Sequence, residues 1–267
     1  MPSYPFCAMP EGDTIAYAAN RMRPVLAGRV PEEVRTPHPR HRMDRWPERL
    51  AGRAVRDVHA HGKHLFLRFE GDLTLHSHLR MTGAWGVYRR GGGRWRRSRA
   101  RAWLVLRAGS HDVVQFDGPV LELMTESRTR FDLRLAALGP DILAPQFDMP
   151  RFLRRLSEDD PTRAIGDALL DQRILAGIGN LWKVEGCWLA EIDPWRALRS
   201  LSGDEARRLV EVTRPRMQES AMDGNQSRHR RIYGRQGVPC PRCGERIRAR
   251  GQGDDNRITF WCPGCQR

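Results

Sequence analysis

The chain has 267 residues, enough to bury a substantial core and to hold two domains and a small module. Its 46 Lys and Arg residues against 32 Asp and Glu residues leave a net charge of +14, which favours a polyanionic partner, although an arginine-rich proteome would produce the same excess. No apolar stretch approaches the roughly 20 residues of a membrane span, and the first eight residues lack the regions of a signal peptide. We therefore expect a cytoplasmic protein with no membrane partner.

The stretch MPEGDTIAYAANRM resembles the start of a protein, although it begins at Met9. Apolar residues then recur at helical spacing between a cap-like Asp13 and a terminating Gly28, which predicts a helix whose last turn is disturbed by Pro24. A sequence typical of an N-terminus inside the chain raises the question of where the functional protein begins.

Residues 29–125 carry the period-two pattern of β-strands. The run RAVRDVHAHGKHLFLRFEGDLTLHSHLRMTGAWGVY alternates, with EGD as a hairpin turn, and ARAWLVLRAG and HDVVQFDG form a second pair of strands. The pattern predicts a β-sandwich or barrel. Within it, residues 89–101 (RRGGGRWRRSRAR) form a basic, glycine-rich loop, whose composition favours a mobile, solvated segment over a specific contact.

The second half of the chain is predicted to be helical. Three amphipathic segments begin near Pro or Ser, at residues 149–159, 161–175 and 201–219. Residues 222–231 are predicted to be a linker, and short strands are expected around the cysteines of the last thirty or so residues.

Four of the six cysteines form two pairs near the C-terminus, whereas Cys7 and Cys187 stand alone. Two Cys-x2-Cys pairs separated by 18 residues present four soft ligands with no open position, which predicts one structural, tetrahedral zinc ion per chain rather than disulfides. So small a module depends on the metal for its folding free energy. The predicted ligands are Cys240, Cys243, Cys262 and Cys265.

Three weaker signals each concern a single turn or residue. Gly177 and Gly179 form a reversal before Asn180, which either caps the following helix or donates to a phosphate oxygen. Lys63 lies in a tight turn of a chain that otherwise uses Arg almost everywhere, and Lys, unlike Arg, is readily tuned to exchange a proton. Arg257 precedes Cys262 by five residues on the cysteine hairpin, where it is either aimed at a ligand or an ordinary surface residue.

Six segments in order resemble the formamidopyrimidine-DNA glycosylase/endonuclease VIII family: MPEGDTI, HGKHLF, LTLHSHLRMTGAW, LLDQRILAGIGNLWKVE, YGRQGVPCPRCG and RITFWCPGCQR. The resemblance covers residues 9–267 and implies an α+β multidomain fold. Its parts would be a catalytic β-sandwich with a leading helix at 9–145, a helix–two-turn–helix DNA-binding domain at 146–230 and a zinc finger at 231–267. Residues 1–8 would be a non-native N-terminal extension.

The resemblance also implies a bifunctional DNA glycosylase and AP lyase of base excision repair, in which Pro10 is the nucleophile. A secondary amine attacks C1′ of the damaged nucleotide, expels the base and leaves a Schiff base, and the strand is then cleaved by β,δ-elimination. An amide nitrogen cannot do this, because its lone pair is delocalised into the carbonyl. We therefore expect translation to begin at Met9 and that methionine to be removed; proteolytic maturation and an inactive enzyme are the alternatives.

By the same resemblance, three further residues take catalytic roles. Glu11 would protonate the departing sugar oxygen, or would serve only as a first-turn acid that stabilises its helix dipole. Lys63 would contact phosphate and assist proton transfer in β-elimination. Arg257 would hold the phosphate beside the lesion and promote δ-elimination.

The resemblance assigns DNA contacts to three more residues. Asn180 would bind phosphate, and Arg80 and Met81 in LRMTG would fill the space left by the flipped base. A core methionine is the alternative for Met81. The partner implied is damaged DNA, double- or single-stranded, bound by a monomer that is associated with the bacterial nucleoid.

The endonuclease VIII branch, which removes oxidised pyrimidines, is favoured over the formamidopyrimidine branch. FDGPVLE lacks the Arg-Arg-Phe wedge of the latter, and LLDQRILAGIGN and FWCPGCQR look closer to the former. The arginine that follows the central strands in the endonuclease VIII branch has no clean counterpart, since the ungapped match falls on Thr125, with Arg128 and Arg130 nearby. A non-catalytic damaged-DNA-binding protein with a blocked N-terminus is the rival function. A zinc-ribbon transcription factor would explain the charge and the cysteines but not Pro10, Glu11 and Lys63.

Overall fold

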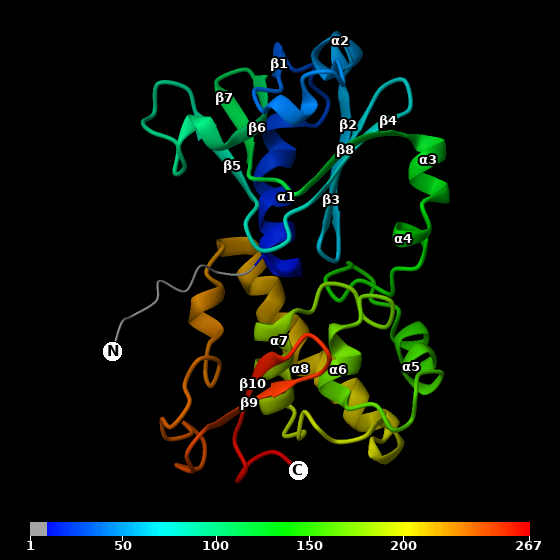
Figure 1. The fold of residues 1–267 in the computed structure, drawn as a ribbon, viewed down its shortest axis with the longest axis vertical. Coiled ribbons are helices and arrows are strands. Elements are labelled where there is room, and N and C mark those ends of the chain that lie inside the picture. The colour runs from blue at the N-terminus through cyan, green and yellow to red at the C-terminus, as the bar shows by residue number, and fades with distance from the viewer. Residues whose placement is uncertain (1–9) are drawn as a thin grey trace. The chain divides into compact units, whose positions relative to one another are not determined.

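The computed structural model describes residues 10–267, which form two compact units (Figure 1). The first unit consists of Pro10 and residues 14–136, and the second consists of residues 11–13 and 137–267. The leading helix α1 (Gly12–Leu26) begins in the second unit and continues in the first, and it starts and ends within two residues of its predicted limits. The predictions made for Met9, Cys7 and residues 1–8 lie outside the described residues.

The first unit is built from two antiparallel sheets of four strands each, in the orders β1-β6-β7-β5 and β2-β3-β4-β8. Short helical segments connect and follow them. The strands are β1 Glu33–Arg35, β2 Val55–His61, β3 His64–Phe69, β4 Leu73–His78, β5 Ala84–Arg89, β6 Ala102–Ala108, β7 His111–Phe116 and β8 Val120–Thr125, and the helices after α1 are η1 Pro39–His41, α2 Trp46–Leu50, η2 Arg99–Arg101, α3 Glu126–Phe131 and α4 Leu133–Ala136.

The core of this unit forms because apolar faces of both sheets and of α1 are buried together. Ile15 and Met22 of α1 lie in one cluster with Leu67 of β3 and Leu104 of β6. Each fully buried Leu, Ile or Met of this kind contributes about 1.5–3 kcal/mol of transfer free energy. The predicted β-sandwich with a leading helix is confirmed.

Two tight turns between the central strands follow the sequence pattern. His61 pairs with His64, so that Gly62 and Lys63 alone connect β2 and β3, and Gly62 has the positive φ of 56° that such a turn requires. The EGD segment connects β3 and β4 as predicted.

The basic loop before β6 differs from the mobile, solvated segment that its composition favours. Trp95 packs against Tyr88 and Phe116, with ring centroids 5.9 and 5.8 Å apart, and the Ser98 side chain caps η2. An indole placed among arginines gains more by joining this small apolar cluster than by facing water. The second half of the loop is therefore held on the sheet.

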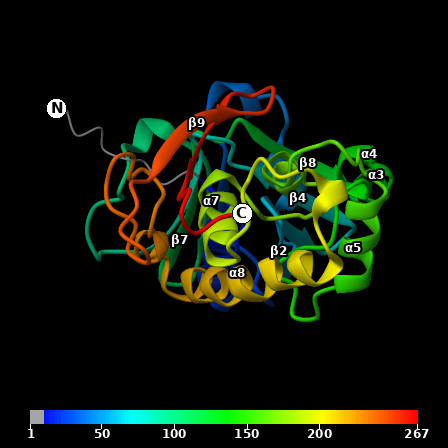
Figure 2. The same ribbon diagram turned by 90° about the horizontal axis from the view of Figure 1, so that it is seen from below.

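The second unit is helical, with a two-stranded hairpin near its end. Figure 2 shows α7 and α8 side by side, and α6 and β10 also pack against α7. The Ser202 side chain and Glu205 form a capping box at the start of α8, and the helix continues through Pro215 to Asp223. The elements are α5 Met149–Ser157, α6 Ile165–Leu170, α7 Asn180–Leu189, η3 Leu198–Ser200, α8 Gly203–Asp223, η4 Gln226–His229, β9 Arg248–Gln252 and β10 Arg257–Trp261.

Two predictions for this unit need correction. The helix predicted over residues 161–175 is limited to α6, because Ala164 at its start pairs with Ala197, and the chain turns after Leu170. The linker predicted at residues 222–231 contains η4, in which Gln226 is buried and donates to Asp13. Across residues 10–267, no helix has both the length and the apolar character needed to cross a bilayer.

Candidate active site and metal centre

The segment that follows Pro10 is seated against the N-terminus of α7. The Glu11 carboxylate is 2% exposed and accepts hydrogen bonds from the backbone N–H groups of Gly179, Leu181 and Trp182, at 3.0, 2.9 and 3.3 Å. These are the N–H groups that the start of a helix leaves without internal partners. Glu11 therefore caps a helix that begins 169 residues later in the chain.

This geometry explains the glycines of the GIG turn. A Cβ on Gly179 would lie 2.3 Å from the Glu11 Cδ atom, and a Cβ on Gly12 would lie 2.8 Å from the Gly177 Cα atom. The Gly12 N–H also donates to the Gly177 carbonyl at 2.9 Å. Only glycine allows two backbones to approach so closely. The PEG and GIG segments are thus complementary surfaces.

The alternative role for Glu11, a first-turn acid for its own helix, is wrong in one respect. The carboxylate does stabilise a helix N-terminus, but the helix is α7 rather than α1. The predicted cap of α1, Asp13, is also used differently, since its buried carboxylate accepts from Ser220 Oγ at 2.6 Å and from Gln226 Nε2 at 3.1 Å. The short segment next to Pro10 is consequently anchored at both ends.

Asn180 is the first residue of α7 and does not cap it, which removes that alternative. Its Nδ2 atom donates to the Ile258 carbonyl of β10 at 2.8 Å, and the residue is buried. One turn later, Lys183 Nζ donates to Thr259 Oγ1 at 2.5 Å and to Gln252 Oε1 at 3.2 Å. These side chains tie α7 to the strand that begins with Arg257.

Sequence reasoning missed Lys183, although it is the other lysine of the chain and the argument used for Lys63 applied to it equally. Lys183 is fully buried, and burial lowers its pKa to about 8, with a smaller lowering from Arg257. A nearly dry ammonium held by two neutral oxygens is costly, so this residue is not an ordinary core side chain.

Arg257 stands at the turn end of the β9–β10 hairpin, where it pairs with Gln252. Its side chain is 41% exposed, and Nη2 lies 3.3 Å from Asp255 Oδ2 in the hairpin turn. It lines a polar hollow together with Arg163, Asp167 and Gln252. An incoming phosphate would replace Asp255 as the anionic partner of this guanidinium.

The four predicted metal ligands are brought together. All four Sγ atoms lie within 4.8 Å of one another, with Cys240–Cys265 at 3.8 Å and Cys243–Cys262 at 3.4 Å. A tetrahedron with metal–sulfur bonds of about 2.3 Å has sulfur–sulfur edges of about 3.8 Å, so the cluster fits a metal ion and is too open for disulfides. Cys240 and Cys262 also pack against Val184 and Trp188 of α7, which places the metal module on the helix that Glu11 caps.

The first unit holds the remaining predicted residues. Lys63 occupies the β2–β3 turn, and beyond it the ring nitrogens of His64 and His76 are 2.8 Å apart. Burial lowers the pKa of His64 to about 2 and that of His78 to about 4, the latter with help from Arg80 and Lys63. These histidines are therefore neutral at pH 7. The alternation of His76 and His78 in LTLHSHLRM was the signal that sequence reasoning missed.

Arg80 and Met81 lie together in the turn between β4 and β5. Met81 is 53% exposed, so the alternative of a core methionine is wrong. Arg80 has a φ of 49°, and its N–H donates to His78 Nδ1 at 3.1 Å. The turn presents both side chains at the surface of the first unit.

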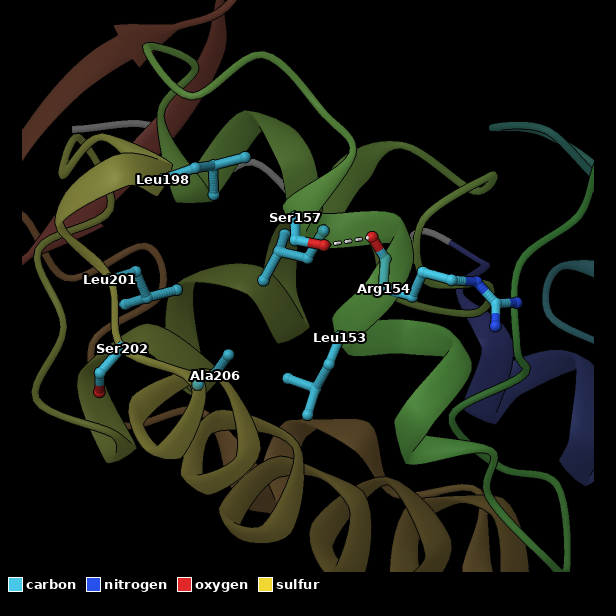
Figure 3. Close-up of a pocket in the computed structure, with 9 residues that line it drawn as sticks. Leu153, Arg154, Ser157, Leu198, Leu201, Ser202 and Ala206 are labelled. Carbon is cyan, nitrogen blue, oxygen red and sulfur yellow. Dashed lines mark hydrogen bonds between the residues drawn. The ribbon is translucent and has the colours of Figure 1, made fainter.

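A separate hollow between α5 and α8 has no such chemistry (Figure 3). Leu153, Leu201 and Ala206 point into it, whereas the Arg154 guanidinium points away and its carbonyl accepts from Ser157 Oγ at 2.7 Å. With only apolar groups and hydroxyls to offer, it is not a candidate active site.

A β-sandwich with a leading helix, followed by a helical unit and a four-cysteine module, defines the class of helix–two-turn–helix DNA glycosylases. The family model for the formamidopyrimidine-DNA glycosylase N-terminal domain matches residues 9–132, and that for the H2TH domain of the same family matches residues 138–231. The chain therefore belongs to the formamidopyrimidine-DNA glycosylase/endonuclease VIII family, as its motifs predicted.

Relatives along the full length agree with this assignment. Probable endonuclease 8 2 of Streptomyces coelicolor is 42% identical, covering 97% of this chain and 94% of that protein. The DNA-(apurinic or apyrimidinic site) lyase Nei2 of Mycolicibacterium smegmatis is 34% identical over 97% and 99% of the two chains. The structure of Lactococcus lactis formamidopyrimidine DNA glycosylase bound to AP-site DNA has the same fold, with a TM-score of 0.80 at 24% identity over 96% and 99%.

Proposed function

We propose that this chain is a bifunctional DNA glycosylase and AP lyase of base excision repair whose nucleophile is the secondary amine of Pro10. The observation that carries the proposal is the anchoring of Glu11, the residue next to Pro10, by three N–H groups at the start of α7. That anchoring gives the nucleophile a fixed position beside a carboxylate, as covalent catalysis requires. Family membership and the lyase name of the Mycolicibacterium relative support the same activity.

In this proposal the active chain begins at Pro10, because a proline acylated by Met9 has no nucleophilic lone pair. The amine bonds to C1′ as the glycosidic bond breaks, and the departing base takes a proton from water. Glu11, held as a carboxylate acceptor, takes the amine proton and returns it to the sugar oxygen as the ring opens. The match of the N-terminal family model from residue 9 supports this start.

The remaining candidates divide the later steps between them. Lys63 contacts phosphate and assists the proton transfer of β-elimination, and Arg257 holds the phosphate whose departure completes δ-elimination. Asn180 contributes a phosphate contact, and Arg80 and Met81 fill the space that the flipped nucleotide leaves in the DNA duplex. The exposure of Met81 and the partly exposed guanidinium of Arg257 support these roles.

The metal of the four-cysteine module is, we infer, a single structural zinc ion. Four thiolates with no open position are the donor set that tetrahedral zinc prefers. When bound, the zinc ion would close the module and fix the β9–β10 hairpin against α7. The hairpin in turn would hold Arg257 in place. The damaged base is proposed to be an oxidised pyrimidine, which the 42% identity to a protein named endonuclease 8 supports.

The experiment compares protein that begins at Pro10 with protein that retains residues 1–9. Each is incubated with a DNA duplex containing one abasic site and treated with borohydride, which reduces a Schiff base to a stable cross-link. Cross-linking is expected only for the form with a free Pro10 amine, and N-terminal sequencing of native protein should begin at Pro10. Equal cross-linking by the extended form would show that another amine is the nucleophile.

The rival function, a damaged-DNA-binding protein without catalysis, predicts a different result. Both forms would bind abasic DNA, and neither would form a cross-link or cleave the strand. The two outcomes are therefore separated by one gel.

A further inference from the structure

The basic loop places one arginine between two turns of the first unit. A single Nη1 atom of Arg97 donates to the Thr82 carbonyl at 2.6 Å and to Asp117 Oδ2 at 2.6 Å. Thr82 belongs to the β4–β5 turn that carries Arg80 and Met81, and Asp117 belongs to the turn between β7 and β8. Arg97 thus connects the turn with the exposed methionine to a second, neighbouring turn.

The acceptor of this contact is itself held in place. Arg101 Nε donates to Asp117 Oδ1 at 2.9 Å, and the Asp117 N–H donates to the Arg101 carbonyl at 3.1 Å. Asp117 has a φ of 48°, a conformation that persists only where its surroundings impose it. The side chains of Arg97 and Asp117 are 24% and 18% exposed, so their ion pair is less screened than a surface pair.

The arginine is also fixed from its own side of the contact. Trp95, two residues before it, packs against Tyr88 and Phe116 of the sheet, and the guanidinium of Arg99 lies 5.0 Å from the Trp95 ring. The loop backbone on both sides of Arg97 is therefore attached to the sandwich. A charged side chain anchored in this way fixes the position of the turn that it contacts.

A side chain that enters a base stack must itself be held in a fixed position. Unstacking a base step costs a few kcal/mol, and a flexible turn would add the entropy of its own ordering to that cost. The Gly83 N–H donates to the Leu79 carbonyl across the β4–β5 turn, and Arg80 has a φ of 49°. Met81 lies between Arg80 and Gly83. The position of its side chain depends on the carbonyl of the next residue, Thr82, which Arg97 holds.

We propose that Arg97 is a positioning residue, which with Asp117 holds residues 79–83 in the conformation that lets Met81 replace a flipped base. The proposal rests on the proposed glycosylase function. It assigns part of the arginine-rich loop to the geometry of the wedge, and it separates Arg97 from neighbours such as Arg94 that add only positive charge.

The test compares base excision from a duplex and from a single strand, using protein that begins at Pro10 and DNA with one oxidised pyrimidine. A single strand has no stack to fill, so the wedge matters only for the duplex. Arg97→Ala should lower the single-turnover rate of excision from the duplex about tenfold, because that is the scale of losing a hydrogen bond to a charged group. The rate on the single strand should stay within about twofold of wild type. Arg94→Ala, an exposed arginine of the same loop, should leave the duplex-to-single-strand ratio unchanged.

A double-mutant comparison identifies the route of the effect. In a Met81→Ala background, Arg97→Ala should cause no further loss on the duplex, because the element it positions is already gone. A further tenfold loss in that background, or equal losses on both substrates, would overturn the proposal. If Arg97→Ala lowers the melting temperature below the assay range, Asp117→Asn, which keeps the size of the side chain, should give a smaller loss confined to the duplex.

Failure of this inference is distinguishable from failure of the proposed function. If wild-type protein beginning at Pro10 neither excises the base from either substrate nor cross-links to abasic DNA, the glycosylase proposal fails. If it does both and Arg97→Ala behaves like Arg94→Ala, only the positioning role is lost.

Discussion

Replacing Glu11 by glutamine tests whether this carboxylate is a structural cap as well as a catalytic group. One oxygen, Oε1, accepts from Leu181 N–H, and the other, Oε2, accepts from Gly179 and Trp182 N–H. An amide has one oxygen and one NH2 group. In its best orientation the amide oxygen accepts from the Gly179 and Trp182 N–H groups. The NH2 group then faces the Leu181 N–H, so that two donors face each other without an acceptor.

The magnitude follows from that geometry. One hydrogen bond to a charged group is lost, worth about 1.5–3 kcal/mol, and the other two become neutral and weaker. A buried N–H without an acceptor adds about 1–3 kcal/mol, and the interaction of the negative charge with the α7 dipole also disappears. Glu11→Gln should therefore lower the free energy of unfolding by about 3 kcal/mol, which is on the order of 10 °C in melting temperature.

The assay is thermal and urea unfolding followed by circular dichroism, with Glu126→Gln as the matched control. Glu126 is also an acid in the first turn of a helix, but it is exposed, so the same substitution should change stability by less than about 0.5 kcal/mol. If Glu11→Gln melts within a degree or two of Glu126→Gln, the carboxylate does not cap α7 as we infer.

The same variant has a catalytic prediction, measured well below its melting temperature. Base excision should collapse, because the carboxylate that moves the proton between Pro10 and the sugar oxygen is gone. Cleavage of a ready-made abasic site should partly survive, since no base has to be expelled. Equal losses on both substrates would mean that the structural effect accounts for the whole phenotype.

Four further predictions follow from the second unit. Cys243→Ser should lose the one zinc ion per chain, measured by metal analysis, whereas Cys187→Ala should keep it, because Cys187 lies outside the cysteine cluster. Asn180→Ala should weaken binding to all duplexes alike, since a phosphate contact carries no sequence information, and an unchanged affinity in salt titrations would leave Asn180 only its bond to β10. Arg257→Ala should still form the Schiff base but accumulate the β-elimination product, so a wild-type ratio of β- to δ-product would reduce the hairpin to a clamp. Burial lowers the pKa of Lys183 from 10.5 to about 8, so the folded state binds fewer protons than the unfolded state between those values, and stability should rise with pH there by up to about 3 kcal/mol relative to Lys183→Met.

Local patterns in the sequence were sufficient for the architecture and the metal ligands. Period-two alternation is a property of a few neighbouring residues, and it located the sandwich and the turn that holds Lys63. The cysteine pairs are likewise local, since each tight Cys-x2-Cys turn presents two sulfurs by itself. The local predictions failed where a tertiary contact intervened: Ala164 pairs with Ala197 at the start of α6 in the helix predicted over residues 161–175, and Gln226 reaches Asp13 in the predicted linker of residues 222–231.

The partners of the buried charges were decided by tertiary structure alone. Glu11 caps a helix 169 residues away, Lys183 finds its acceptors in a hairpin about 70 residues further on, and Arg97 bonds to turns 15 residues before it and 20 after it. Nothing in a run of residues marks these partners, because a buried ion is satisfied by whichever backbone or side-chain group the fold brings within about 3 Å. The sequence therefore predicted candidate residues for the chemistry, and the fold determined how each of them is held.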